Sequence, residues 1–195
     1  MYSRIAIDAE LGEYLRSFQP PFKPEIPTSM RHIISILLQN EAGALARVSA
    51  MFSSRGYNIE SLNVAPTDDV QVSRLTLVTI GSEHVIGQIN KQLLKLVDVV
   101  STVDMTLGDH IERELLLLKL RLDDEGRERI RELVRQEGAR VLDDAEAHFT
   151  IELTGAANRI DQFINRAAGI AEILRVVRSG PLAITRGAPA PATAV

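Results

Sequence analysis

Apolar and polar residues follow two successive series of strand-type and helix-type periods along the chain. In the first series, the pattern predicts strands over 31–39, 57–65, 72–80 and 97–107. Helices are predicted over 44–55 and after Ser82, with Ile86, Ile89, Leu93 and Leu96 on one inner face. The apolar phase slips between Ile59 and Leu62, which indicates a bulge or an irregular edge in the second strand.

A second series of the same kind begins near residue 109. It predicts strands over 114–122, 141–144, 148–153 and 173–177. Asp123 or Asp124 is expected to cap the first helix and Gly138 to end it. The inner faces of the two helices comprise Ile130, Leu133, Val134, Ile160, Phe163, Ile164 and Ala167.

Each series has the order β-α-β-β-α-β, the split arrangement of ferredoxin-like domains. We therefore predict an α+β fold with two ferredoxin-like βαββαβ domains in tandem, over 30–108 and 109–186. Residues 1–29 are predicted to be an N-terminal extension with an amphipathic stretch over 4–18 and a Pro-rich linker. Whether that stretch docks on a surface or is disordered stays open. Residues 187–195 are expected to form a flexible tail.

Composition narrows the classes of function. The chain has 195 residues, 4% aromatic residues and a net charge of -4, which argue against a nucleic-acid partner. No apolar run approaches the length that crosses a membrane. The first residues include Asp8, Glu10 and Glu13, a pattern unlike that of a secretory or organelle-targeting peptide. The absence of cysteine excludes disulfides and thiolate metal sites, and is compatible with a cytoplasmic protein.

We find no catalytic constellation in the sequence. The four histidines, at positions 32, 84, 110 and 148, lack the spacing of metal ligands. The acidic pairs at 68–69, 123–124 and 143–144 fall at predicted turns or helix starts, where Asp is favoured for capping. Phosphate loops, nucleophile elbows and dinucleotide fingerprints do not occur. We therefore expect no catalytic residue, no metal site and no bound cofactor in this chain.

The turn between the first strand and the first helix is the best candidate binding site. A helix N-terminus near Gly43 presents unpaired N–H groups that suit a carboxylate. Gly43 has no side chain to obstruct a ligand, and the Asn40 amide both donates and accepts, so that the turn suits a small zwitterion. The alternative is that Asn40 caps the helix and Gly43 relieves backbone strain. The equivalent turn of the second series, at 122–126, contains three acids that would repel a carboxylate.

Several segments, taken in order, resemble one family. They are Leu38-Gln39-Asn40-Glu41-Ala42-Gly43-Ala44-Leu45, Arg55-Gly56-Tyr57-Asn58-Ile59-Glu60-Ser61-Leu62, Val64-Ala65-Pro66-Thr67-Asp68, 88–93, 95–100 and 113–115. Through them residues 31–186 resemble the regulatory (small) subunits of acetolactate synthase, which contain ACT domains. The run from Arg55 to Asp68 is the most specific part of this resemblance.

The resemblance implies a non-catalytic subunit. Its partners would be a second copy, through a homodimer of ACT domains, and the catalytic (large) subunit of acetolactate synthase. That catalytic subunit would contain thiamine diphosphate, Mg²⁺ and FAD, and this chain would raise its activity. Feedback by valine, or by another branched-chain amino acid, would act through this chain. A free-standing amino-acid-sensing ACT protein that acts on another partner is the alternative.

The resemblance also implies an effector site between two ACT domains of a dimer. Its residues would be Asn40, Ala42, Gly43, Ala44, Leu45, Asn58, Ile59, Ala65 and Gln88. Asn40 and Gly43 would form one wall, and Asn58 would come from the facing protomer. Ala65 and Gln88 are weaker members of the set. Two departures from the family pattern are Asn63, where Thr is more usual, and the extension over 1–29.

Overall fold

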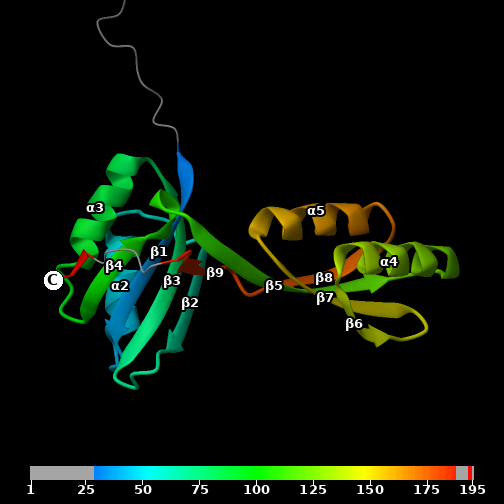
Figure 1. Cartoon of the computed structure of the whole chain (residues 1–195), viewed down its shortest axis with the longest axis horizontal. Coiled ribbons are helices and arrows are strands. Elements are labelled where there is room, and N and C mark those ends of the chain that lie inside the picture. Colours follow the sequence, from blue (N-terminus) through cyan, green and yellow to red (C-terminus); the bar gives the residue numbers. More distant parts are fainter. Residues whose placement is uncertain (1–28, 188–192, 195) are drawn as a thin grey trace, which may run out of the picture.

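The computed structural model describes residues 29–187 and 193–194, which form two α+β units joined by one long strand (Figure 1). The elements of the first unit are β1 (Met30–Gln39), α2 (Ala44–Ser54), β2 (Ser61–Pro66), β3 (Val72–Gly81), α3 (Glu83–Leu93), β4 (Val99–Asp104) and the 3-10 helix η1 (Met105–Leu107). Those of the second are β5 (His110–Arg121), α4 (Asp124–Glu137), β6 (Arg140–Asp144), β7 (His148–Gly155), α5 (Ala157–Ala168) and β8 (Glu172–Arg178), followed by β9 (Leu182–Thr185) and β10 (Thr193–Ala194). Both units have the predicted βαββαβ order.

The first unit is an antiparallel sheet in the order β4-β1-β3-β2, with α2 and α3 on one face. Because side chains of a strand alternate between faces, Ile34, Ile36 and Leu38 of β1 point together toward the helices. There they pack in a core with apolar residues of α2, β3 and α3, including Phe52 and Ile89. β2 ends the sheet as an edge strand.

The second unit repeats this arrangement in the order β8-β5-β7-β6. Leu116, Leu118 and Leu120 of β5 are fully buried, and pack with Ile130 of α4 and Phe163 of α5 in a separate core. Figure 1 shows α4 and α5 on the same side of this sheet. The other face of the sheet is not covered by these helices.

The predicted capping residues of α3 and α4 are in place. The Ser82 side chain accepts a hydrogen bond from the Val85 N–H at the start of α3. Asp123 caps α4 by accepting from the Gly126 N–H at 2.7 Å. Gly138 ends α4 in the left-handed region, with φ 60°.

The prediction of a strand over 57–65 is wrong at its start, because β2 begins only at Ser61. The Tyr57 N–H donates to the Phe52 carbonyl at 3.1 Å, and their rings meet edge-on with centroids 6.0 Å apart. Tyr57 therefore packs over the end of α2 and does not join the sheet. Of the predicted bulge or irregular edge, the bulge is absent, since the register between β2 and β3 is regular from Ser61 to Pro66. The slip in the apolar phase marks the start of the strand.

The predicted strand over 97–107 is shorter in the structure and is followed by a 3-10 turn. β4 ends at Asp104, whose side chain accepts from the Thr106 N–H at 2.9 Å and so begins η1. Similarly, α3 ends at Leu93, so that Leu96 packs on the core from beyond the helix.

β9 was not predicted from the sequence. It pairs with the first four residues of β5, which explains why β5 begins at His110 and not at Glu114. Ala183 of β9 packs against Ile33, Val78 and Met105 on the face of the first sheet opposite to the helices. The chain therefore returns from the second unit to the first. Thr193 and Ala194, in the predicted flexible tail, form β10 and pair with β4.

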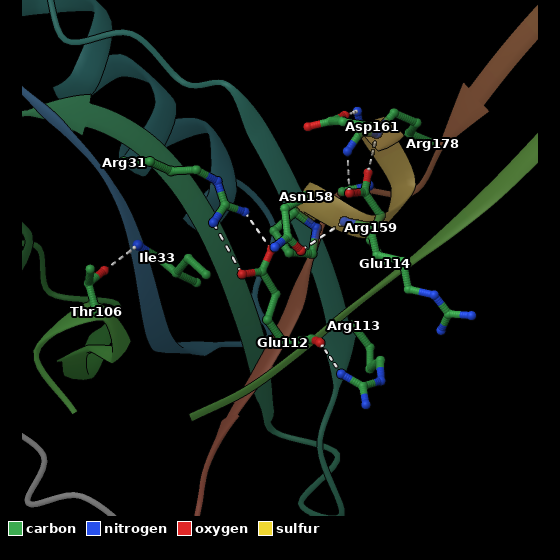
Figure 2. A network of polar contacts seen from close by, with 12 residues as sticks. Arg31, Ile33, Thr106, Glu112, Arg113, Glu114, Asn158, Arg159, Asp161 and Arg178 are labelled. Carbon is green, nitrogen blue, oxygen red and sulfur yellow. Dashed lines mark hydrogen bonds and ion pairs between the residues drawn. The ribbon is translucent and has the colours of Figure 1, made fainter. Parts of the chain in front are cut away.

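Polar contacts near the start of β5 also connect the two units (Figure 2). Arg31 of β1 makes a two-pronged ion pair with Glu112, at 3.2 and 2.7 Å. The Asn63 side chain of β2 donates to the Pro181 carbonyl at 3.2 Å. Gly180, with φ 74°, lies so close to Ser61 that an added Cβ would come within 2.9 Å of the Ser61 Cβ. The glycine allows β2 and the segment after β8 to approach each other.

The predicted amphipathic helix over 4–18 lies outside the described residues. Within the part of the chain that the structure describes, no helix has the length and apolar character needed to cross a membrane.

Candidate functional site

The turn from Gln39 to Gly43 lies at the start of α2, as predicted. Gly43 is the N-cap residue and adopts the left-handed region with φ 88°. It offers no side-chain cap to the helix, and Asn40 does not cap it either. The Asn40 side chain instead donates to the Val70 carbonyl at 3.0 Å, in the turn between β2 and β3. The capping interpretation of Asn40 is therefore wrong, whereas the need for glycine at position 43 is confirmed.

Free N–H groups remain at this helix end. The Ala44 N–H is engaged by the Glu41 carbonyl at 3.2 Å, so it is not available to a ligand in this arrangement. In the described part of the chain, the N–H groups of Gly43, Leu45 and Ala46 have no hydrogen-bond acceptor. Such groups at a helix start attract a carboxylate.

Arg47, which we did not predict, adds a positive charge beside Gly43. Its Nε and Nη2 atoms donate to the buried carboxylate of Asp98 at 2.5 and 2.6 Å. Its Nη1 atom lies 2.9 Å from the position that a Cβ on Gly43 would occupy. Asp98 thus holds the guanidinium over the turn, with Nη1 beside Gly43. The signal in the sequence was the spacing of four residues between Gly43 and Arg47, which brings them to one side of a helix turn.

We expect this arrangement to be insensitive to pH between about 5 and 8. Hydrogen bonds from Arg47 hold the pKa of the Asp98 carboxyl below its ordinary value. A carboxyl with a lowered folded-state pKa contributes stability above its unfolded pKa, near 4, and loses it as the pH falls through the folded pKa. Thermal unfolding of the wild type and Asp98→Asn from pH 8 to 3 checks this. A change in the melting temperature above pH 5 that occurs in the wild type and not in Asp98→Asn would contradict this expectation.

The structure separates the remaining predicted site residues into two groups. Ala65 pairs with Arg74, which pairs with Leu37, so Ala65 lies at the end of the sheet near Asn40. Asn58 lies at the opposite end, because its carbonyl accepts from Thr79 at 2.7 Å and Thr79 pairs with His32. His32 and Asn40 are eight residues apart, or about 26 Å along an extended chain.

Ile59 and Gln88 accompany Asn58 at this far end. Ile59 packs on the first core, and the Gln88 side chain accepts from the Tyr57 hydroxyl at 3.4 Å. The predicted site residues therefore lie at two ends of the first unit. One end contains Asn40, Ala42, Gly43, Ala44, Leu45 and Ala65. The other end contains Asn58, Ile59 and Gln88. One chain does not bring all nine residues together.

No candidate metal site is present in the described residues, since His, Asp and Glu side chains do not gather there in groups of three or more. The four histidines are distributed between both units. His32 is buried against Asp104, with Nδ1 and Oδ2 3.1 Å apart.

Comparisons with known proteins agree with this architecture. Residues 34–101 match the family model described as AHAS small subunit-like ACT domain, and residues 113–187 match the model for the small subunit of acetolactate synthase. The acetolactate synthase isozyme 3 small subunit of Salmonella typhimurium is 44% identical over 158 residues, which are 81% of this chain and 97% of that protein. The Haemophilus influenzae acetolactate synthase small subunit is 43% identical over 81% of this chain and 97% of its own length.

A solved structure shows the same relation in three dimensions. The crystal structure of the acetolactate synthase small subunit from Thermotoga maritima superposes with a TM-score of 0.74 and 31% sequence identity. The match covers 82% of this chain and 99% of that one, so that both units are included. With both family models matched in order and close relatives aligned over nearly their full length, this chain belongs to the family of acetolactate synthase small subunits.

Proposed function

We propose that this chain is the regulatory subunit of an acetolactate synthase, which activates the catalytic subunit and confers feedback inhibition by valine or another branched-chain amino acid. The similarity to small subunits over both units is the observation that carries this proposal. The catalytic subunit would contain thiamine diphosphate, Mg²⁺ and FAD, and the complex would act in the cytoplasm. The role of this chain is then binding and control, without chemistry of its own.

The edge of the first sheet supports a homodimer through the ACT domains. Among the described strands β2 pairs with β3 only, which leaves its outer backbone groups available to another strand. Antiparallel pairing of two β2 strands across a two-fold axis brings the start of one strand beside the end of the other. Asn58, just before Ser61, would then approach Ala65 and Asn40 of the facing protomer. The two groups of predicted site residues would thereby form one site.

The chemistry of the turn suits the head group of an amino acid. The free N–H groups of Gly43 and Leu45, with Arg47 Nη1, would receive the carboxylate. The Asn40 amide oxygen accepts no hydrogen bond from any described residue, and would accept one from the ammonium group. A ligand bound between two protomers favours the dimer arrangement to which it binds more tightly. The shift toward that arrangement would then change the activity of the partner enzyme.

The test is an activity assay with purified catalytic subunit. We expect the chain alone, supplied with thiamine diphosphate, Mg²⁺ and FAD, to form no acetolactate from pyruvate. Added to the catalytic subunit, the chain should raise the rate, and valine should then lower it. A mixture that is no faster than the catalytic subunit alone would overturn the proposal, as would activity of the chain by itself.

A free-standing amino-acid sensor is the alternative function. It would bind the amino acid but would not co-purify with a thiamine-diphosphate enzyme. Affinity purification of the tagged chain from its own cells, with the catalytic subunit identified by mass spectrometry, separates the two functions.

A further inference from the structure

β2 lies between the two groups of predicted site residues. Asn58 comes just before the strand, and Ala65 lies near its end. Ser61 pairs with Val78, whose side chain packs on the face of the first sheet opposite to the helices. Because side chains alternate along a strand, Asn63 and Ala65 share that face with Ser61. One face of β2 therefore combines a residue of the proposed effector site with two residues that point elsewhere.

The chain segment after β8 is packed on this face of β2. Gly180 and Pro181 are both buried, and the Asn63 side chain donates to the Pro181 carbonyl at 3.2 Å. A Cβ added to Gly180 would lie 2.9 Å from the Ser61 Cβ and 3.1 Å from the Asn63 Nδ2 atom. No side chain fits between the two segments, so a shift of β2 displaces Gly180 as well.

Gly180 is in turn fixed to the second unit. Its N–H donates to Glu114 Oε1 at 3.2 Å, and the same carboxylate accepts from Arg178 Nε and Nη2 at 2.8 and 2.7 Å (Figure 2). Arg178 Nη1 also donates to Asp161 of α5 at 2.6 Å. Glu114 is buried, which strengthens its charge-assisted hydrogen bonds. A movement of Gly180 would therefore reach β5, β8 and α5 together.

One buried group at this contact is unsatisfied. The Ser61 hydroxyl is buried and has no hydrogen-bond partner among the described residues. An unpaired buried hydroxyl destabilises the arrangement that contains it. A cavity of about 590 Å³, lined in part by Ser61, Gly180 and Arg178, adjoins the contact. The contact thus has both a reason and the room to adopt a second arrangement, which an element that couples two sites requires.

We propose that Asn63, Gly180 and Pro181 form a joint that transmits effector binding beside β2 to the second unit. The inference rests on the proposed function and adds the path of its regulation. An effector held between two protomers would fix β2 in one position, and the joint would pass that position to Gly180 and on to Glu114. Asn63 is a positioning residue in this scheme, because its side chain binds the Pro181 carbonyl and not the effector.

Asn63→Ala tests the joint in the complex of the full chain with its catalytic subunit. It removes one neutral hydrogen bond, a factor of about 2–10 in an equilibrium, against about 5–150 for a typical coupling between sites. We expect the fraction of activity that saturating valine removes to fall by about half. Activation without valine should stay the same. The valine Kd of the chain, from isothermal titration calorimetry, should change by less than about twofold.

Glu112→Ala is the matched control. It removes the ion pair between Arg31 and Glu112, which also connects the two units but joins β5 to β1 and not to β2. Maximal inhibition by valine should equal that of the wild type. Gly180→Ala is a second variant of the joint, because its new Cβ would push the segment away from Ser61. It should reproduce the effect of Asn63→Ala.

The outcomes distinguish this inference from the proposed function. If the wild-type chain neither activates the catalytic subunit nor makes it sensitive to valine, the proposed function fails, and the joint with it. If the wild type responds and valine inhibits Asn63→Ala to the same maximal extent, the joint is wrong and the function stands. A raised valine Kd with unchanged maximal inhibition would place Asn63 in the effector site. An equal loss of inhibition in Glu112→Ala would indicate general loosening between the units. Both would overturn the proposal.

Discussion

Replacing Glu114 with alanine is expected to lower the free energy of unfolding by about 2–4 kcal/mol. The Glu114 carboxylate is buried and accepts hydrogen bonds from Arg178 Nε at 2.8 Å, Arg178 Nη2 at 2.7 Å and the Gly180 N–H at 3.2 Å. The carboxylate raises the pKa of Arg178, so this cation persists at every practical pH. Without Glu114, Arg178 would retain Asp161 only, and the buried Gly180 N–H would lose its acceptor.

Glu112→Ala is the matched control, since Glu112 also pairs with one arginine and lies two residues earlier in β5. Its partner Arg31 is 38% exposed, so the loss should stay below about 1 kcal/mol. Glu114→Gln, which keeps an acceptor without the charge, should lie between the two. Urea unfolding followed by circular dichroism measures all three variants. Equal losses of unfolding free energy for Glu112→Ala and Glu114→Ala would show that burial does not make the Glu114–Arg178 ion pair contribute more to stability.

Gly43→Asp is expected to remove feedback inhibition by valine while leaving activation of the catalytic subunit intact. The new carboxylate would lie where we place the carboxylate of the effector, beside Arg47 Nη1. Two like charges a few Å apart at a partly exposed site repel by about 1–4 kcal/mol, which weakens binding by about one to three orders of magnitude. The measurement is the rate of the complex against valine concentration.

Strain must be separated from charge in this variant. Asp is usually favourable at a helix start such as the one predicted near Gly43, but φ 88° strains any residue with a Cβ at this position. Gly43→Asn is the control, since Asn has the same shape, tolerates this region better and carries no charge. It should retain more sensitivity to valine than Gly43→Asp. An unchanged valine curve for a Gly43→Asp chain that still activates would place the effector elsewhere.

The elements that could be predicted from sequence are those whose signals are local. The alternation at Ile34, Ile36 and Leu38, and the helical spacing of Ile160 and Phe163, depend only on which face of an element is buried. Caps such as Asp123 act on an N–H group three residues away. The helix start at Gly43 was predictable for the same reason, and with it the position of the candidate site.

Other features of the site depend on pairing between distant residues. Asp98, which orients Arg47, is 51 residues away from it in the chain. Nothing in the residues around Arg47 indicates that partner. The alternative in which Asn40 caps its own helix fails because the fold brings the Val70 carbonyl within 3.0 Å of its side chain.

By itself, then, the sequence determined the βαββαβ order, the two cores, most helix ends and the family resemblance. The tertiary structure alone decided that β9 returns to pair with β5, that Glu114 is buried against Arg178, and that Asn63 binds the Pro181 carbonyl. The physical reason is the range of the interactions. Periodicity and capping are set within a few residues, whereas strand register and ion pairing depend on which distant segments the packed cores bring together.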